Sequence, residues 1–278
     1  MAAPRSERLT KWLIAGPPLA FLLLFFLLPS LIMALASLRY PGEFGGLAPL
    51  ALRSGEESGL TFENYALFFG DWIYAQIFAK SLGIAALTTL VCLVMAYPLA
   101  MLIARSPKRR RDFMVLLVIL PFASNFLVRI YAWMIILGPM DLLFSRFAVI
   151  VGMVYVHLPF MILPLYTNLE KHDPALLDAA QDLGANAWQT FWRVTFPLSL
   201  PGVFSGAALV FIPVLGMFAV PELLGGKDDW MVGNMIKESF LGTRDWPFGS
   251  MLAIMLTLAV LAIAGAAALY ARKEVAHA

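Results

Sequence analysis

Long apolar stretches alternate with short polar connections along the whole chain. A helix that crosses the hydrocarbon core of a bilayer needs about 20 consecutive, mostly apolar residues. Six stretches reach this length, at residues 12–36, 78–103, 113–137, 147–166, 201–224 and 248–271. They are long and continuous, whereas the strands of a membrane barrel would be short and alternating. Because lipid offers backbone groups no hydrogen-bond partner, each stretch is predicted to be helical. We therefore expect an all-α membrane protein with six transmembrane helices.

Composition excludes a soluble protein with a large core. Hydrophobic residues make up 61% of the chain and charged residues 14%, whereas a soluble domain carries about 25% charged residues. The one cysteine, Cys92, lies in an apolar run, so no disulfide within the chain is possible. The three histidines are scattered, and no Cys/His group has the spacing of metal ligands. We predict no metal site.

The first apolar stretch has two interpretations. Arg5, Arg8 and Lys11 precede it, and residues 34–36 (Ala-Leu-Ala) imitate a cleavage site, as in a secretory signal peptide. The apolar core of a signal peptide is only about 7–15 residues long, however, and this stretch is far longer. We expect it to be retained as a membrane span.

Basic residues predict which connections face the cytoplasm. Positive charge concentrates in cytoplasmic loops, and five basic residues crowd the connection after the second stretch: Arg105, Lys108, Arg109, Arg110 and Arg111. With an even number of spans, the tails at 1–11 and 272–278 fall on the same side. The opposite connection, 37–77, is acidic, with Glu43, Glu56, Glu57, Glu63 and Asp71 against Arg39 and Arg53. We expect both termini to be cytoplasmic, 168–200 to be a cytoplasmic loop, and 225–247 to be extracytoplasmic.

The cytoplasmic loop 168–200 is patterned as two short helices. Asp173-Pro174 is typical of an N-cap followed by proline at the first helical position. A helix through Leu183 should then stop at Gly184. Asn186 can cap a second short helix that carries Trp188, Phe191 and Trp192 and ends at Pro197. Leu176, Leu177, Ala180 and Leu183 share one face. Such helices lie either on the lipid surface or against a partner protein.

The spacing within this loop resembles a family signature. It runs Asp178-Ala179-Ala180, three residues, Gly184, nine residues, Val194, one residue, Phe196-Pro197. This is similar to the EAA signature of binding-protein-dependent ABC importer permeases, which reads Glu-Ala-Ala, then glycine, then Ile-x-Leu-Pro. Asp, Val and Phe stand here for Glu, Ile and Leu. The chain is identified as a member of this family, which implies the type-1 permease fold.

The resemblance implies a mechanical role for the loop. In the family it is the coupling helix, which docks in a groove of a cytoplasmic ATPase, and the positions that carry this role here are Asp178, Ala179, Ala180, Gly184 and Pro197. Small alanines allow close approach, and glycine permits the turn between the helices. The sequence has no GxxxxGK[ST] phosphate loop. We expect no enzyme activity and no cofactor in this chain, with ATP and Mg bound by the partner ATPase.

Four further stretches resemble one branch of the family, the permeases of spermidine/putrescine importers. They lie at residues 125–131, 158–166, 221–226 and 244–247, and the resemblance covers about 80–271. It implies a complex in the bacterial inner membrane. The other members would be a second homologous permease, two ATP-binding subunits and a periplasmic polyamine-binding protein. The connection at about 138–146 is shorter than this branch leads us to expect.

A path for polycations should offer carboxylates, carbonyls or aromatic faces. Glu222 is the best carboxylate, near the outer end of the fifth stretch. Arg129 falls at a matching depth in the third stretch. Two roles therefore compete for Glu222, namely an ion pair with Arg129 or direct contact with a polyamine. Asn125, Tyr131 and Trp246 complete the candidate path. A simpler interpretation places Glu222 and the aromatic residues at the membrane interface.

Other charged and bent positions have ordinary explanations. His157 is predicted to be a hydrogen-bonded packing residue rather than a proton relay. Asp141, Asp228 and Asp229 are predicted to be solvated loop charges. Pro159 and Pro164 are expected to bend the fourth stretch and free carbonyl groups.

Three alternatives remain open. The nearest is an ABC importer permease for another small solute. An ATPase-independent secondary transporter would need paired acids within the membrane or broken helices in symmetric halves. A membrane-embedded enzyme would need a cluster of catalytic groups within the spans, and the sequence has none. Apart from the lipid bilayer, we expect protein partners only and no nucleic acid.

Overall fold

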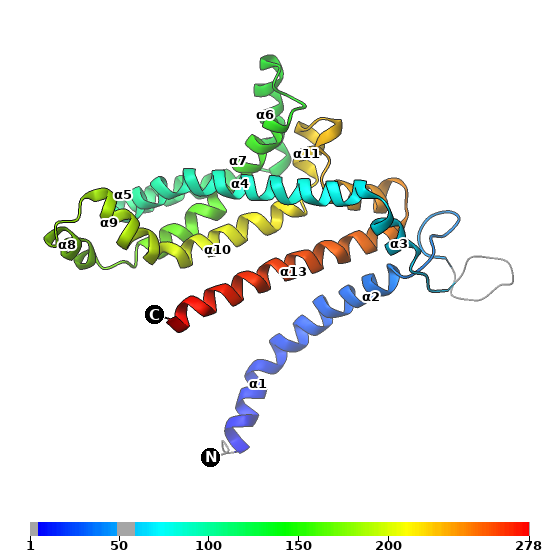
Figure 1. Ribbon diagram of the computed structural model, residues 1–278, viewed down its shortest axis with the longest axis horizontal. Helices are drawn as coiled ribbons and strands as arrows, with labels where there is room; N and C mark the ends of the chain where they lie inside the picture. Colours follow the sequence, from blue (N-terminus) through cyan, green and yellow to red (C-terminus); the bar gives the residue numbers. More distant parts are fainter. Residues whose placement is uncertain (1–4, 49–58, 278) are drawn as a thin grey trace. The chain divides into compact units, whose positions relative to one another are not determined.

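The helices of the computed structural model follow the apolar stretches (Figure 1). The structure describes residues 5–48 and 59–277. In these residues five helical runs are long and apolar enough to cross a membrane, and a bent pair counted as one span makes six. This confirms the all-α membrane fold. The α-helices are α1 Arg5–Leu22, α2 Leu28–Ala36, α3 Glu63–Gly70, α4 Trp72–Arg105, α5 Lys108–Ile119, α6 Phe126–Leu137, α7 Arg146–Leu169, α8 Pro174–Asp182, α9 Ala187–Thr190, α10 Phe196–Leu215, α11 Ala219–Leu224, α12 Val232–Lys237 and α13 Trp246–His277.

The third predicted span is broken rather than continuous. A 3-10 turn, Leu120–Ala123, follows α5, and the axes on the two sides of the break differ by 91°. Pro121 lies in this turn, and proline cannot donate the backbone hydrogen bond that a continuing helix needs. The Asn125 side chain then accepts a hydrogen bond from the Leu127 amide and starts α6 anew. The prediction of one helix over 113–137 was therefore wrong.

The fifth predicted span, 201–224, is also two helices. α10 ends at Leu215, and α11 starts only at Ala219. The Phe218 carbonyl between them accepts a hydrogen bond from the Asn234 side-chain amide at 3.0 Å, so a carbonyl freed at the break has a partner. A straight helix does not connect Pro201 with Glu222, so the depth of Glu222 in the membrane stays a prediction.

The connections that were predicted as loops hold helical structure. Residues 225–247 include α12 and a π-helical turn, Glu238–Gly242. The connection 37–77 includes α3 and the first turns of α4. Arg53, Glu56 and Glu57 lie outside the described residues, as do residues 1–4 and 278 of the two tails. The described parts of both tails are helical, in α1 and α13.

The chain divides into two compact units, of which the first joins the two ends of the sequence. It consists of residues 5–48, 59–75 and 235–277 in the described chain. Within it α13 packs against α2 and α3. The ring of Tyr74 lies 5.8 Å from that of Phe68 and 5.4 Å from that of Phe248. The first and last spans therefore belong to one packed unit.

The second unit, Gln76–Asn234, is built on α7 and α10. Gly202 and Gly206 lie one turn apart on α10 where it meets α7. A Cβ atom at Gly202 would lie 2.7 Å from Asn168 Cβ, and one at Gly206 would lie 2.7 Å from Met161 Sδ. Small residues four apart allow membrane helices to approach closely. This pair therefore fixes how α10 lies on α7.

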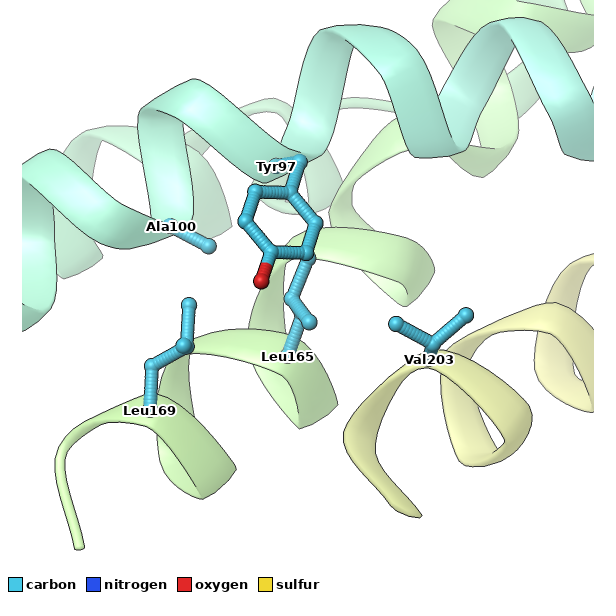
Figure 2. Packing of buried hydrophobic residues seen from close by; sticks show 5 residues of the cluster. All are labelled: Tyr97, Ala100, Leu165, Leu169 and Val203. Carbon is cyan, nitrogen blue, oxygen red and sulfur yellow. The ribbon is translucent and has the colours of Figure 1, made fainter. Parts of the chain in front are cut away.

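Helix α4 joins this unit through buried side chains. Tyr97 and Ala100 of α4 pack with Leu165 and Leu169 of α7 and with Val203 of α10, and all five are buried (Figure 2). Earlier in α4, the Cys92 thiol contacts the Val154 carbonyl at 3.8 Å. The cluster in Figure 2 lies where α4, α7 and α10 approach the segment that carries α8 and α9 (Figure 1).

Candidate functional site

Helix α8 begins and ends at the residues expected from its sequence. The Asp173 carboxylate accepts a hydrogen bond from the Ala175 amide at 3.0 Å, and Pro174 is the first helical residue. Gly184 follows the helix with φ +80°, a left-handed conformation that L side chains rarely adopt. Its amide donates to the Gln181 carbonyl at 2.8 Å. The helix, its cap and the glycine joint are confirmed.

Helix α9 starts with a complete capping box. The Asn186 side chain accepts from the Gln189 amide at 2.9 Å, and the Gln189 side chain accepts from the Asn186 amide at 3.1 Å. The prediction that this helix ends at Pro197 is wrong. The helix runs on through a π-helical turn, Phe191–Thr195, into α10 without a break up to Leu215.

The π-turn explains why Pro197 does not stop the helix. In a regular helix the proline ring collides with the carbonyl four residues earlier, here that of Arg193. Arg193 lies within the wider π-turn, which leaves room for that ring. The second short helix and the fifth span are consequently one continuous helical run.

The apolar side chains of the segment divide into two groups. Ala180 is buried and Leu177 is half-buried, whereas Leu183 and Trp188 are 89% and 70% exposed. We name the exposed set the coupling face. It consists of Leu176, Leu183, Trp188 and Trp192. Among the small residues of the signature, Ala179 is exposed with Asp178, while Ala180 already packs within the chain.

Several contacts hold the segment on the spans. The Phe191 ring lies edge-on to Tyr97 of α4, with centroids 5.3 Å apart. The His172 ring contacts the Leu198 carbonyl at 3.2 Å. Next to it an ion pair of 2.6 Å joins Glu170, after α7, to Arg111 of α5. Figure 1 shows α8 and α9 together at one end of the second unit, beyond the end of α4.

The candidate path residues concentrate on α6 and α11, which pack against each other. Asn125 caps α6 and is exposed, Tyr131 is 49% exposed, and Glu222 is exposed on α11. The Arg129 guanidinium lies over the Phe122 ring, 5.6 Å from its centroid, and its buried Nε has no hydrogen-bond partner. The Arg129–Glu222 ion pair stays a prediction.

Trp246 is not placed with those residues. It is the first residue of α13 and belongs to the first unit, where its side chain is 47% exposed. His157, in contrast, is confirmed as a packing residue, because it is buried and its Nδ1 lies 2.8 Å from the Met153 carbonyl oxygen. Helix α7 continues unbroken through Pro159 and Pro164.

Asp229 is not the solvated loop charge that was predicted. It is buried, and its carboxylate accepts hydrogen bonds from the Gly226 amide at 3.0 Å and from Arg146 Nε at 3.3 Å. Asp228, in contrast, is exposed, and its carbonyl accepts from Lys80 Nζ at 2.6 Å. The sequence missed this site because Arg146, the charged partner of Asp229, lies 83 positions away along the chain. Within the described residues no group of three potential metal ligands occurs.

Comparison with protein families decides the assignment. The family described as the inner membrane component of binding-protein-dependent transport systems matches residues 96–274, which include all of α7 to α12 and so the segment that carries α8 and α9.

The chain belongs to this family.

Individual relatives extend over most of the chain. The spermidine/putrescine transport system permease protein PotB of Haemophilus influenzae is 40% identical over 257 residues, which cover 86% of each chain. The protein of the same name from Escherichia coli is 41% identical over 215 residues, 71% of this chain and 78% of the relative. The chain is thus a multi-pass permease subunit of an ABC importer, and the family and localisation predicted from the sequence are confirmed.

Solved structures confirm the fold. A crystal structure of a bacterial ABC transporter involved in the import of the acidic polysaccharide alginate is similar, with a TM-score of 0.70. It shares 17% sequence identity, and the match covers 97% of this chain and 99% of the other. A complex of an alginate transporter with a periplasmic protein gives a TM-score of 0.64 at 16% identity, covering 93% and 92%. The ABC importer permease fold is therefore established.

Proposed function

We propose that this permease moves polyamines such as putrescine and spermidine across the inner membrane in an ATP-driven importer. One observation carries the proposal, namely the 40% identity over 86% of both chains with a spermidine/putrescine permease. The four stretches singled out in the sequence support it, because three of them lie on α6, α7 and α11 of one unit. The alginate transporters share only 16–17% identity and support the fold alone.

The partners follow from this assignment. The importer would contain a second homologous permease, two ATP-binding subunits that hold ATP and Mg, and a periplasmic polyamine-binding protein. The coupling segment, with Asp178, Ala179, Ala180, Gly184 and Pro197, is the element of this chain that would meet an ATPase subunit. In this arrangement the loop 168–200 and both termini are cytoplasmic.

Three features of the segment suit it to transmit movement. Its coupling face exposes large apolar side chains, including Trp188, and exposed aromatic and apolar residues next to polar surface are typical of binding sites. Helix α9 continues into α10, so a push on α9 moves a membrane span directly. Gly184 lets α8 turn against α9. A hinged pair of rigid elements of this kind can convert domain closure into movement of the spans.

The path for a polycation would run along α6 and α11. Glu222 supplies a carboxylate on α11, Asn125 an amide oxygen and Tyr131 an aromatic face on α6, all exposed. These groups favour ammonium ions. Arg129 on the same helix would repel a cation, so it would either pair with a carboxylate or mark the limit of the path. Trp246, which belongs to the first unit, stays a candidate aromatic contact from the sequence alone.

Uptake measurements test the proposal. Vesicles that carry the complete complex should accumulate labelled putrescine or spermidine only with ATP inside and binding protein outside. Glu222→Gln should lower uptake at least fivefold, with complex assembly intact, whereas Glu63→Gln, at an exposed carboxylate of α3, should leave uptake unchanged. Transport of another solute without any polyamine uptake would overturn the substrate. Polyamine uptake without ATP would overturn the ATP-driven mechanism.

A further inference from the structure

An apolar groove follows the last third of α4. Its volume is about 550 Å³, and it ends at Arg105, the last residue of the helix. The walls come from α4 and from one ring of the π-turn before α10. Its apolar lining residues are Val94, Tyr97, Pro98, Met101, Leu102 and Phe191. Val94 and Leu102 are 65% and 55% exposed, so the groove opens to the surroundings of the span.

The length of the groove matches one leaflet of a bilayer. Eleven residues separate Val94 from Arg105, roughly 16 Å at 1.5 Å per residue. Half of a hydrocarbon core of about 30 Å is about 15 Å. Since Arg105 ends the span at the interface, Val94 lies near the middle of the membrane. The groove therefore extends from the membrane surface to the midplane.

The groove has room for an extended hydrocarbon chain. Its volume of about 550 Å³ lies along roughly 16 Å of α4, and its walls are mostly apolar. An acyl chain needs no hydrogen-bond partner from such walls.

The charge at the end of the groove fits a phosphate. The Arg105 side chain forms no ion pair with another part of the described chain. Its side chain also borders two hollows under α8 and α9, of about 530 and 300 Å³. The acidic residues there are Asp178 and Glu170, but Glu170 is paired with Arg111 at 2.6 Å. Four more basic residues follow Arg105 by position 111, so positive charge dominates.

We infer that this groove binds an anionic phospholipid, with one acyl chain between Val94 and Leu102 and the phosphate at Arg105. Clusters of basic residues directly after a membrane span attract anionic lipid headgroups. Phe191 is both a wall of the groove and part of the π-turn that joins α9 to α10. A bound lipid thus supports the coupling segment from the membrane side. This inference does not depend on the transported substrate.

Lipid retention by the purified complex tests the inference. The complete complex is reconstituted in nanodiscs of equal parts phosphatidylglycerol and phosphatidylethanolamine, extracted in detergent and analysed by native mass spectrometry. Arg105→Gln should lower retained phosphatidylglycerol at least fivefold. Val94→Trp should do the same by filling the inner end of the groove. Lys227→Gln, at an exposed basic residue outside this cluster, and Leu90→Trp are the matched controls, and both should retain the lipid of the unaltered complex.

Three outcomes would overturn the inference. Retention that is unchanged in Val94→Trp, which leaves Arg105 intact, would exclude the groove. Selection of phosphatidylethanolamine over phosphatidylglycerol would exclude the role of the charge. A photo-crosslinking amino acid at Leu102 should become attached to phospholipid, and attachment to the second permease instead would show that protein covers the groove.

Discussion

The hydroxyl oxygens of Tyr97 in α4 and Ser199 in α10 lie 2.7 Å apart. The Ser199 hydroxyl donates its single proton to the Phe196 carbonyl at 2.8 Å, so the Tyr97 hydroxyl is the donor between the two. Both residues are buried. The bond ties two spans together just where the coupling segment becomes α10.

Removing the two hydroxyls separately should have unequal effects. In Tyr97→Phe the Ser199 proton keeps its acceptor, so about 1 kcal/mol of stability is lost. In Ser199→Ala the buried Tyr97 hydroxyl loses its acceptor, and a buried unsatisfied group costs about 1–3 kcal/mol. Thermal unfolding of the purified complex should show the larger decrease in Tm for Ser199→Ala. Ser205→Ala, at an exposed serine of α10, is the control. The reverse order would contradict the donor assignment.

The joint at Gly184 should tolerate asparagine but not proline. Its φ is +80°, and a side chain there would have nothing within 4 Å, so only the backbone conformation limits substitution. Asparagine tolerates the left-handed conformation, whereas proline fixes φ near −65° and removes the amide that bonds Gln181. Gly184→Pro should insert into the membrane normally, but its ATP-driven uptake should be at least tenfold lower. Gly184→Asn should retain most of the ATP-driven uptake. Full uptake by the proline variant would disprove the hinge.

Removing Asp229 should destabilise the protein more than removing its ion-pair partner Arg146. Asp229 is buried and also accepts the Gly226 amide, whereas the Arg146 side chain is 63% exposed. Asp229→Ala should cost about 1.5–3 kcal/mol, the range for hydrogen bonds to charged groups. Arg146→Gln should cost less than about 1 kcal/mol, as exposed partners of ion pairs usually do.

Chemical unfolding of the purified permease measures both Asp229 and Arg146 variants. Asp228→Ala is the matched control, because that neighbouring carboxylate is exposed and should not affect stability. Equal losses of unfolding free energy in Asp228→Ala and Asp229→Ala would show that the burial of Asp229 does not add to its contribution to stability.

The coupling face should be required for association with the ATPase subunit. Leu183 is 89% exposed, so Leu183→Asp places a charge on this face without disturbing the fold. A central apolar contact is worth about 2 kcal/mol or more, so affinity for the ATPase should fall roughly 30-fold. Co-purification and titration of the ATPase subunit measure it. Phe44→Asp, at a 93% exposed phenylalanine of the other unit, should leave affinity unchanged. Unchanged binding by Leu183→Asp would place the ATPase elsewhere.

Local signals in the sequence predicted several parts of the molecule correctly. The first and fourth spans, the Asp173 and Asn186 caps and the glycine joint all depend on residues within a few positions of each other. Hydrophobic length and capping chemistry act over that same range. The family signature is local too, since it occupies one loop.

Hydropathy could not predict where the spans break, although Pro121 and the Asn125 cap are local signals of the first break. An apolar run is compatible with the membrane whether it forms one helix or two. The runs 113–137 and 201–224 therefore have the same hydropathy as unbroken spans. The break after Leu215 is stabilised by Asn234, a residue outside the span. The continuation of α9 past Pro197 likewise depends on a π-turn that has no clear sequence pattern.

The sequence alone determined the membrane class, the span regions and the two capped helices of the loop 168–200, because apolar length and helix caps are read from neighbouring residues. Only the tertiary structure decided that Asp229 is buried against Arg146, that Tyr97 bonds Ser199, and that Arg105 closes an apolar groove. Tyr97 and Ser199 are 102 positions apart, and Arg146 and Asp229 are 83 apart. Partners at such separations leave no periodic trace, so folding had to bring them together before their chemistry could be recognised.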